Sequence, residues 1–542
     1  MRARPGALSR TRYGSGWALE DHPAPDGEAV TPGSGWRRLR LPRLLSTLHA
    51  EVVDAGLGST AMLGLAGTAA IALGSSQPGS PFALDQPGAW FFGTGLPKGG
   101  PGDVVAQLAV YGGVALLIKV WFDLVKALRE RPLPSIRPLA VIFGLWVLPL
   151  LVAPPLFSGD VYSYAAIGDM VTHGISPYHY GPAVLGANAY VAPVNPLWAN
   201  APAPYGPLFI GLAGWLTFMT AHQQLFTLEA LRLLAVGGVA LAGVFLPELA
   251  RGQGRNPSSV FALAILNPLT LLGLVASGHN DALMAGLLVA GLAMAKRGRP
   301  LTGIVLCTLA TGIKSPAALG IAYIAWEWMT ESADWRTRIR RLFASGLISL
   351  AVMEVLGLVT RAGWGWVTTF STPGAVRSVI TPLTDVSFSG MLLIRAVSVG
   401  PDLTTLLTVV RGLGLLVAAV ICVRLLLTRH RLGVLPSLGI SLLVLVALGP
   451  VIQTWYLTWG MMVLAAVVVG RWWGLFVWLS ILAAAITIPD VQSFVSTVLG
   501  DATGLVVFGV ALLMCREATV QRMRQRVAGL PLARGLAWSP GP

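Results

Sequence analysis

Apolar runs of at least ~17 residues recur along most of this chain, and each is long enough to cross the roughly 30 Å hydrocarbon core of a bilayer. Of the 542 residues, 54% are hydrophobic and only 11% are charged, whereas a soluble domain carries about 25% charged residues. The mean hydropathy is +0.70. The sequence therefore predicts an all-α polytopic integral membrane protein.

The two ends of the chain lack this apolar pattern. Residues 1–50 are rich in Gly, Pro and Arg, and residues 516–542 are basic. We expect both to be flexible cytoplasmic tails flanking a transmembrane domain over residues 51–515. Because the apolar runs begin only after position 50, no cleavable signal peptide is expected.

The formal net charge of +14 comes mainly from short basic clusters between apolar runs, as the positive-inside rule requires. We therefore expect no nucleic-acid partner. The three cysteines, Cys307, Cys422 and Cys515, lie within or at the ends of apolar runs without metal-ligand spacing. Neither a disulfide framework nor a metal site is indicated.

The basic clusters set the expected topology, because they should face the cytoplasm. They lie at 37–43, 126–137, 251–255, 296–299, 336–341, 424–431, 471 and from 516 onward. Spans at roughly 55–74, 104–124 and 136–156 then place residues 158–204, which contain no Lys or Arg, on the outer face.

An odd number of crossings must separate this outer segment from cytoplasmic Arg251, yet two apolar segments follow, at roughly 206–221 and 226–249. We predict that the shorter one, Pro207 to Thr220, lies in the interface or dips in without crossing. The chain thus has two long outer loops that carry interfacial helices, at 158–225 and 361–402.

The remaining apolar runs predict a hairpin and a series of further spans. Spans at roughly 258–277 and 281–296 form the hairpin, whose tip faces the same side as Asp160. The stretch 300–330 predicts two short helices with Lys314 near an outward turn. Further spans are expected at roughly 340–360, 403–427, 434–452, 456–470, 472–488 and 497–514, for about 14 crossings.

Asp160 emerges where the third predicted span ends, which suits a general base acting on a lipid-borne substrate. A solvated loop acid or a helix cap is the alternative. Asp169 lies nine residues on, a turn of about 180° if the segment is helical. Asp169 is expected to be structural, capping or solvated.

Aromatic and histidine side chains gather in the first outer loop and suit a platform for a sugar or a lipid headgroup. An ordinary interfacial aromatic belt is the alternative. The same two interpretations apply to the turn Gln453 to Trp459, where belt anchoring is favoured. The candidates for substrate contact in these segments are Tyr162, Tyr164, His173, Tyr178, Tyr205 and Gln453.

The hairpin tip supplies donors, an amide and a carboxylate in His279, Asn280 and Asp281, an inventory that suits several hydroxyls or a phosphate. Helix capping by Asn280 and Asp281 is the alternative. Lys314 lies among apolar residues and requires a phosphate partner, or an ion pair with Asp281 or Glu354. Glu354 is either a functional residue or a partner for a buried base.

This order of motifs resembles the GT-C glycosyltransferases, and more closely the polyprenol-phosphate-mannose-dependent α-(1→6)-mannosyltransferases of lipomannan assembly. The resemblance covers roughly residues 50–515 by span order as much as by motif. The motifs that carry it are Asp160-Val161-Tyr162-Ser163-Tyr164, His173-Gly174 with Pro177-Tyr178, Pro204-Tyr205-Gly206-Pro207, Gly278-His279-Asn280-Asp281 and Lys314-Ser315-Pro316.

The resemblance implies a GT-C-type helix bundle in the plasma membrane with its active site on the outer face. It implies inverting transfer of mannose from a polyprenol-phosphate donor to a glycan or glycolipid acceptor, with Asp160 as the base. Lys314, His279 or Arg377 would supply donors or positive charge to the leaving phosphate. No nucleotide, metal or other cofactor is implied.

Three other functions are compatible with the residues alone. A secondary transporter or a polyprenol-lipid flippase would use Lys314 and Glu354 for ion coupling, although no repeat pairs the two halves of the chain. A GT-C enzyme could use another polyprenol-linked sugar, such as arabinofuranose. A non-catalytic scaffold for envelope assembly predicts that replacing Asp160 changes no product.

Overall fold

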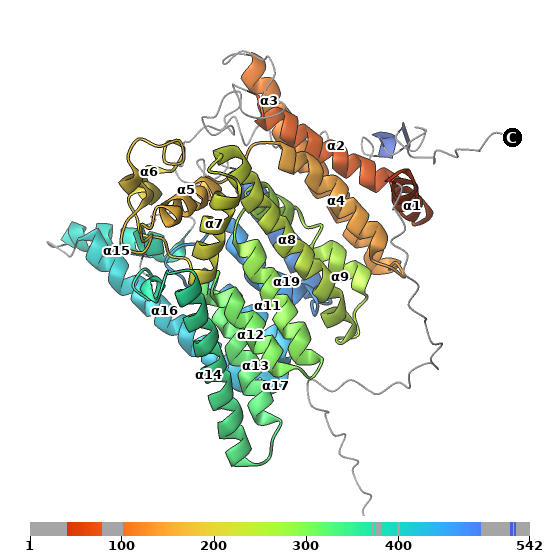
Figure 1. The fold of residues 1–542 in the computed structure, drawn as a ribbon. Coiled ribbons are helices and arrows are strands. Elements are labelled where there is room, and N and C mark those ends of the chain that lie inside the picture. The colour runs from red at the N-terminus through yellow and green to blue at the C-terminus, as the bar shows by residue number, and fades with distance from the viewer. Residues whose placement is uncertain are drawn as a thin grey trace, which may run out of the picture.

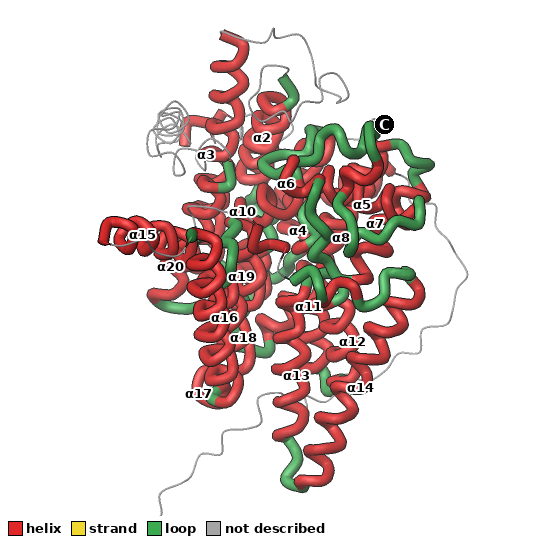
Figure 2. The backbone as a smooth tube through the Cα atoms, turned by 90° about the vertical axis from the view of Figure 1, so that its left-hand side faces the viewer, coloured by secondary structure: helices red, strands yellow, loops and turns green. Residues whose placement is uncertain are grey.

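The computed structural model describes residues 41–77, 101–370, 372–375, 381–397, 402–488, 521–523 and 525–526. Throughout these ranges the chain forms helices and loops and no strand (Figure 2). This confirms the all-α prediction. The expected span at 497–514 and most of both expected tails lie outside the described residues.

The first four helices form one packed group, at the upper right of Figure 1. They are α1 (Leu41–Asp54), α2 (Gly58–Ser75), α3 (Pro101–Glu130) and α4 (Arg137–Val152). The indole of Trp146 fits against Gly64 and donates to the Ala61 carbonyl over 3.1 Å, which ties α4 to α2. The expected tail boundary at residue 50 falls inside α1, because leucines spaced three or four apart continue a helical pattern there.

Short helices follow α4 and lie at the opposite end of the molecule from the α13–α14 turn (Figure 1). They are α5 (Asp160–Thr172), η1 (Pro182–Leu185), α6 (Pro196–Ala199) and α7 (Pro207–Met219). The 13 residues of α7 extend about 20 Å, which is shorter than a bilayer core. This length suits the prediction that the segment does not cross, which stays a prediction.

The centre of the bundle consists of α8 (Gln224–Arg251), α9 (Pro257–Ala264), α10 (Pro268–Thr270), η2 (Leu271–Ala276), α11 (Asp281–Lys296), α12 (Pro300–Thr311), η3 (Ser315–Ala317) and α13 (Ala318–Thr330). Gly238 and Gly286 let α8 and α11 approach closely, because any Cβ at either position would overlap the facing backbone. The two short helices around Lys314 are confirmed as α12 and α13.

The span expected at 258–277 as one helix is wrong in detail. The chain bends by 47° between Pro257–Ala264 and Pro268–Ala276. Asn267 caps the second piece by accepting from the Leu269 N–H over 2.9 Å, and Pro268 cannot continue the first piece. The second piece then widens into the π-helix η2.

The last group of helices includes two long, largely exposed apolar helices, α14 and α16, whereas α19 is mostly buried and packs against α11. The elements are α14 (Trp335–Val359), η4 (Gly365–Val367), η5 (Thr372–Ala375), α15 (Pro382–Val397), α16 (Leu403–Leu427), α17 (Arg429–Leu432), α18 (Val434–Ala447), η6 (Thr454–Tyr456), α19 (Leu457–Ala465) and α20 (Arg471–Ile486). Apolar side chains that remain exposed on such helices suit contact with lipid.

Among the described residues, five helices are long and apolar enough to cross a membrane: α2, α3, α8, α14 and α16. The bent pair α9–η2 makes a sixth candidate. Apolar helices of 10–17 residues, such as α4, α18 and α20, are shorter. The chain is therefore a multi-pass membrane protein, and the expected total of about 14 crossings stays a prediction.

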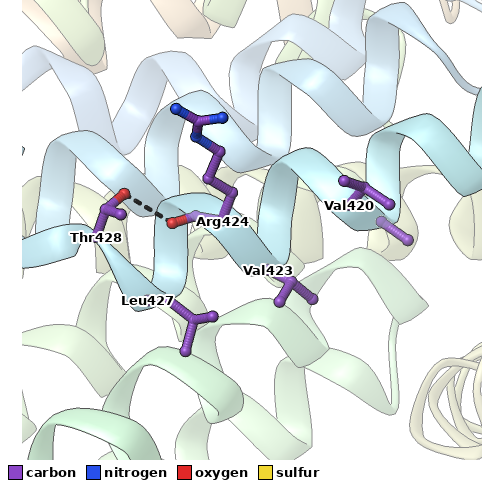
Figure 3. Close-up of a pocket in the computed structure, with 6 residues that line it drawn as sticks. Val420, Val423, Arg424, Leu427 and Thr428 are labelled. Carbon is purple, nitrogen blue, oxygen red and sulfur yellow. Dashed lines mark hydrogen bonds between the residues drawn. The ribbon is translucent and has the colours of Figure 1, made fainter.

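A surface cavity of about 460 Å³ lies along α16 (Figure 3). Its lining is almost entirely apolar, and the Thr428 hydroxyl there donates to the Arg424 carbonyl over 2.7 Å. This cavity contains none of the candidate residues, so the candidate active site lies elsewhere in the structure. The lining residues are Ala419, Val420, Val423, Arg424, Leu427 and Thr428.

Candidate active site

Asp160 is the first residue of α5, and its side chain is 22% exposed. The segment before it is held at two points. The Leu156 N–H donates to the Ala276 carbonyl at the end of η2 over 3.1 Å, and the Asp160 N–H donates to the Ser158 hydroxyl over 3.2 Å. Phe157 between them has a left-handed backbone with φ 64°. The carboxylate is thus presented by a fixed turn.

The buried guanidinium of Arg232 in α8 holds the other end of that turn. Residues 154 and 155 are prolines and have no N–H, so the carbonyls of Leu150 and Leu151 in α4 lack the amide donors that a helix would provide. Arg232 donates to both carbonyls, and to the Ala153 carbonyl over 2.7 Å. It replaces the donors that the prolines remove.

His279 lies directly beside Asp160, with its Nε2 3.6 Å from the carboxylate and 2.9 Å from the Ser158 Oγ. Its Nδ1 hydrogen bonds to the Gly273 carbonyl. Because a carbonyl only accepts, Nδ1 carries a proton and donates. The ring, which is fully buried, stacks on Trp455 with centroids 3.9 Å apart. The Nε2 face is therefore directed to Asp160 and Ser158.

The π-helix η2 makes this orientation possible. The Ser277 N–H donates five residues back to the Leu272 carbonyl, and the Gly278 N–H donates to the Val275 carbonyl. The first bond closes a wider turn than an α-helix and the second closes a tighter one. Neither amide therefore donates to the Gly273 carbonyl, which accepts from the imidazole instead. π-turns inside helices occur frequently at functional sites.

A second charged cluster is built around the buried Asp281, the first residue of α11. Both of its carboxylate oxygens accept from the Lys314 ammonium over 2.9 Å, and Oδ1 also accepts from the Trp459 indole N–H over 2.6 Å. The Lys314 ammonium lies 4.5 Å from the centre of the Tyr456 ring and 6.0 Å from that of Tyr205. Of the partners expected for Lys314, namely a phosphate, Asp281 or Glu354, the structure shows the ion pair with Asp281.

Aromatic side chains connect the two clusters. The rings of Tyr164, Tyr205 and Phe209 meet edge to face, with centroids 4.9–5.2 Å apart. The Tyr178 hydroxyl donates to the Tyr205 carbonyl over 2.9 Å. Burial raises the pKa of the Tyr178 phenol, which keeps it protonated as a donor. Electrostatic interactions reach from Asp160 to Lys314 and Tyr205.

The structure thus brings together Asp160, Tyr164, Tyr205, His279, Asp281 and Lys314 from distant parts of the sequence. Asn280 is buried between His279 and Asp281, and its side-chain amide has no partner among the described residues. Tyr178 contributes by orienting Tyr205.

Other predicted site residues lie elsewhere. His173 lies at the far end of α5, where its Nδ1 is 2.8 Å from the Asp169 carbonyl. Tyr162 is buried and interacts with Arg232. Gln453 precedes η6 with its side chain partly buried. Arg377 lies outside the described residues.

Sequence reasoning missed Ser158, Arg232, Trp455 and Trp459. The favoured interpretation of the turn 453–459 as a belt is wrong for the two tryptophans, because both are at least 93% buried, against His279 and Asp281. A belt residue would face lipid headgroups. The spacing Trp455-x-x-x-Trp459 puts both rings on one helix face, which is the signal that was available.

These features define a multi-pass helical membrane protein with a carboxylate–imidazole pair and a carboxylate–ammonium pair. Residues 61–330 match the family model described as "Alpha-(1->6)-mannopyranosyltransferase, N-terminal domain". Residues 383–515 match the model described as "MptB C-terminal domain".

Curated relatives agree with these matches. Alpha-(1->6)-mannopyranosyltransferase A of Mycobacterium tuberculosis is 32% identical over 76% of this chain and 81% of its own length. A probable alpha-(1->6)-mannopyranosyltransferase of Mycolicibacterium smegmatis is 31% identical over 75% of this chain and 78% of its own length. Alpha-(1->6)-mannopyranosyltransferase B of Corynebacterium glutamicum is 29% identical over 61% of this chain and 59% of its own length.

No solved structure matches the chain. The chain belongs to the GT-C α-(1→6)-mannopyranosyltransferase family, as its motif order predicted. It is a glycosyltransferase, and its substrates are a sugar donor and a glycan acceptor at a lipid bilayer.

Proposed function

We propose that this enzyme transfers mannose from a polyprenol-phosphate-mannose donor to an α-(1→6)-mannan or lipomannan-type acceptor on the outer face of the plasma membrane. The observation that carries the proposal is the partly exposed Asp160 carboxylate, held 3.6 Å from His279 Nε2. Family membership favours this over a transporter, a flippase or a scaffold.

The proposed reaction is a single displacement with inversion at the anomeric carbon. The acceptor hydroxyl oxygen attacks C1 of the β-mannosyl phosphate, the bond from C1 to the phosphate oxygen breaks, and the acceptor proton passes to Asp160. The polyprenol phosphate leaves with the bonding electron pair, and the new linkage is α. A base that removes the proton in this step typically contributes a factor of about 10²–10⁴ in rate.

Lys314 supports the departure of the phosphate. Its ammonium is bound by Asp281 and surrounded by Tyr205, Tyr456 and Trp459, a setting of low polarity in which a cation attracts a phosphate strongly. Asp281 orients this cation and offsets its charge when no donor is bound. His279 Nε2 accepts from the Ser158 hydroxyl over 2.9 Å, and the same hydroxyl accepts from the Asp160 N–H, so the imidazole positions Asp160 through Ser158.

The test uses membranes that contain the wild type or Asp160→Asn, with radiolabelled polyprenol-phosphate mannose and a short α-(1→6)-mannoside acceptor. We expect transfer by the wild type and a loss of about 10²–10⁴-fold in Asp160→Asn. Asp385→Asn, which alters an exposed carboxylate in α15, is the matched control and should retain activity.

Equal transfer by Asp160→Asn and the wild type would remove Asp160 from the mechanism. Transfer from polyprenol-phosphate arabinofuranose but not from the mannosyl donor would identify arabinofuranose, and not mannose, as the transferred sugar. The anomeric configuration of the product, measured by NMR, tests inversion independently, because retention would require a covalent or ion-pair route.

A further inference from the structure

We propose that the residues around η4 form a binding site for the extended chain of the acceptor glycan, an oligomannoside, several sugars away from the reacting hydroxyl. This η4 surface consists of Glu354, Trp364, Trp366 and Phe370. The inference rests on the proposed function, because it concerns the acceptor of that reaction.

The first observation is an ordered set of aromatic faces at the surface. The rings of Trp364 and Trp366 stack with centroids 6.1 Å apart at 30°, and Phe370 meets Trp366 edge to face at 5.2 Å. Trp364 is 41% exposed and Phe370 is 49% exposed. Rigid aromatic rings offer a large contact area at low cost in conformational entropy, and the apolar faces of sugar rings stack on them.

The second observation is a carboxylate that is part of the same surface. The Trp364 indole N–H donates to Glu354 Oε2 over 2.7 Å, so the ring is fixed in orientation. Glu354 lies within the last two turns of α14 and is itself exposed. A carboxylate that faced hydrocarbon would cost several kcal/mol, whereas sugar hydroxyls can donate to it. This combination favours a polar, ring-shaped ligand over an acyl chain.

The third observation is that the η4 surface packs against elements of the candidate active site. Trp366 packs on a small cluster that includes Ile167 of α5 and Tyr178, and the backbone of Gly365 lies against the Tyr178 ring. Tyr178 in turn donates to the carbonyl of Tyr205, whose ring centre lies 6.0 Å from the Lys314 ammonium. The same helix, α5, therefore begins at Asp160 and contacts the η4 surface further along.

The separation fits a chain rather than a single sugar. Ile167 is seven residues from Asp160 along α5, which corresponds to about 10 Å of helix axis. A monosaccharide in the reacting position would not reach this surface, whereas further units of an oligomannoside would. The η4 surface therefore sets the preference for acceptor length and leaves the chemistry to Asp160.

The experiment compares a short acceptor, α-(1→6)-mannobiose, with a long one, α-(1→6)-mannohexaose, at saturating polyprenol-phosphate mannose. In the wild type we expect the KM for the long acceptor to be lower. In Trp364→Ala and Phe370→Ala the advantage of the long acceptor should shrink by about fivefold to tenfold. Trp364→Phe keeps a stacking ring and should lose less of the advantage.

Trp335→Ala is the matched control, because Trp335 is 63% exposed at the opposite end of α14. It should leave the ratio of the two KM values at the wild-type level. A ratio unchanged in Trp364→Ala, or a loss that is equal for both acceptors, would overturn the proposal. The second of these results would identify the aromatic residues as membrane anchors or as part of the general fold.

Direct binding separates this inference from the proposed function. Mannohexaose is titrated against the full-length protein in nanodiscs without donor, with saturation-transfer NMR as the readout. Binding that is weakened in Trp364→Ala supports the η4 surface even if no mannose is transferred from the chosen donor. Binding that is equal in both proteins rejects the η4 surface even if transfer proceeds.

Discussion

Asp160 and Asp169 show how one helix uses two carboxylates for different purposes. They are nine positions apart on α5, so they point about 180° apart. Asp160 lies beside His279, whereas the buried Asp169 accepts from Asn188 Nδ2 over 2.9 Å and lies 2.9 Å from His222 Nδ1. Asp169 thus ties the two ends of the first predicted outer loop together, as the structural interpretation of this residue expected.

Asp169→Asn should therefore destabilise the protein without removing its chemistry. The amide keeps only one of the two acceptor oxygens that contact Asn188 and His222, and the loss of the other costs about 1–3 kcal/mol. Thermal unfolding in nanodiscs should show a lower midpoint, while the folded fraction should retain most of its kcat. An unchanged midpoint together with a complete loss of transfer would instead place Asp169 in the reaction.

Which side chains meet in the site was only partly predictable. The placement of Asp160 and the hairpin tip on one face followed from the basic clusters, and the structure places His279 beside Asp160. The pairing of Lys314 with Asp281 was one of the stated alternatives. The contact between Trp459 and Asp281 joins residues 178 positions apart, and no local pattern encodes such a contact.

At the scale of elements, the position of Asp160 at the start of α5 depends on how the preceding helix, α4, ends. Arg232 is fully buried in α8 and donates to the carbonyls that Pro154 and Pro155 leave without amide partners. An arginine within an apolar run signals a buried partner, but the sequence does not say which carbonyls it will reach. Arg232 is in this sense a positioning residue for Asp160.

Arg232→Lys should reduce both stability and kcat, because an ammonium keeps the charge but cannot reproduce the fork of the guanidinium. Each buried carbonyl left unpaired costs about 1–3 kcal/mol. We expect a lower unfolding midpoint and a fall in kcat with little change in the KM for the donor.

Arg297→Lys provides the comparison, because Arg297 pairs with Glu248 at a more exposed place, and exposed pairs contribute at most about 1 kcal/mol. Equal behaviour of the two variants would contradict the role given to Arg232.

Helix positions were predicted better than helix interruptions. The expected span 403–427 coincides with α16, and 226–249 differs from α8 by two residues at each end. The bend at Asn267 and the π-turn were not predicted, because hydrophobicity is continuous through both and only the Asn267-Pro268 pair marks a break. The expected span 340–360 begins later than α14, which starts at Trp335 and includes the basic cluster at 336–341. A helix can extend beyond the part that lies in the bilayer.

At the scale of the whole molecule, the main untested expectation is which loops face the cytoplasm and which face the outside. Helix lengths alone do not test it. The 28 residues of α8 extend about 42 Å, enough to cross a bilayer completely. The 13 residues of α7 are too few to cross at full depth. The loops with α5 and α6 lie at one end of the molecule and the α13–α14 turn lies at the other (Figure 1).

Reporters fused after His222 and after Arg255 should consequently appear on opposite sides of the membrane, with His222 outside. A pair of reporters sensitive to the two compartments, such as alkaline phosphatase and green fluorescent protein, gives the assignment. Finding both positions on one side would mean that α8 does not cross the membrane. Finding His222 inside and Arg255 outside would mean that α7 and α8 cross as a hairpin. In either case the parity of all later crossings would change.

The π-turn before His279 also places a limit on how this region of the chain can vary. If Leu271–Ala276 wound as an ordinary α-helix with the same number of residues, every following side chain would rotate by about 100°. His279 would then face away from Asp160, whatever residues lined the site. The wide turn is therefore a functional property in its own right, and amino-acid exchanges that preserve it should be tolerated better than exchanges that restore an ordinary helix.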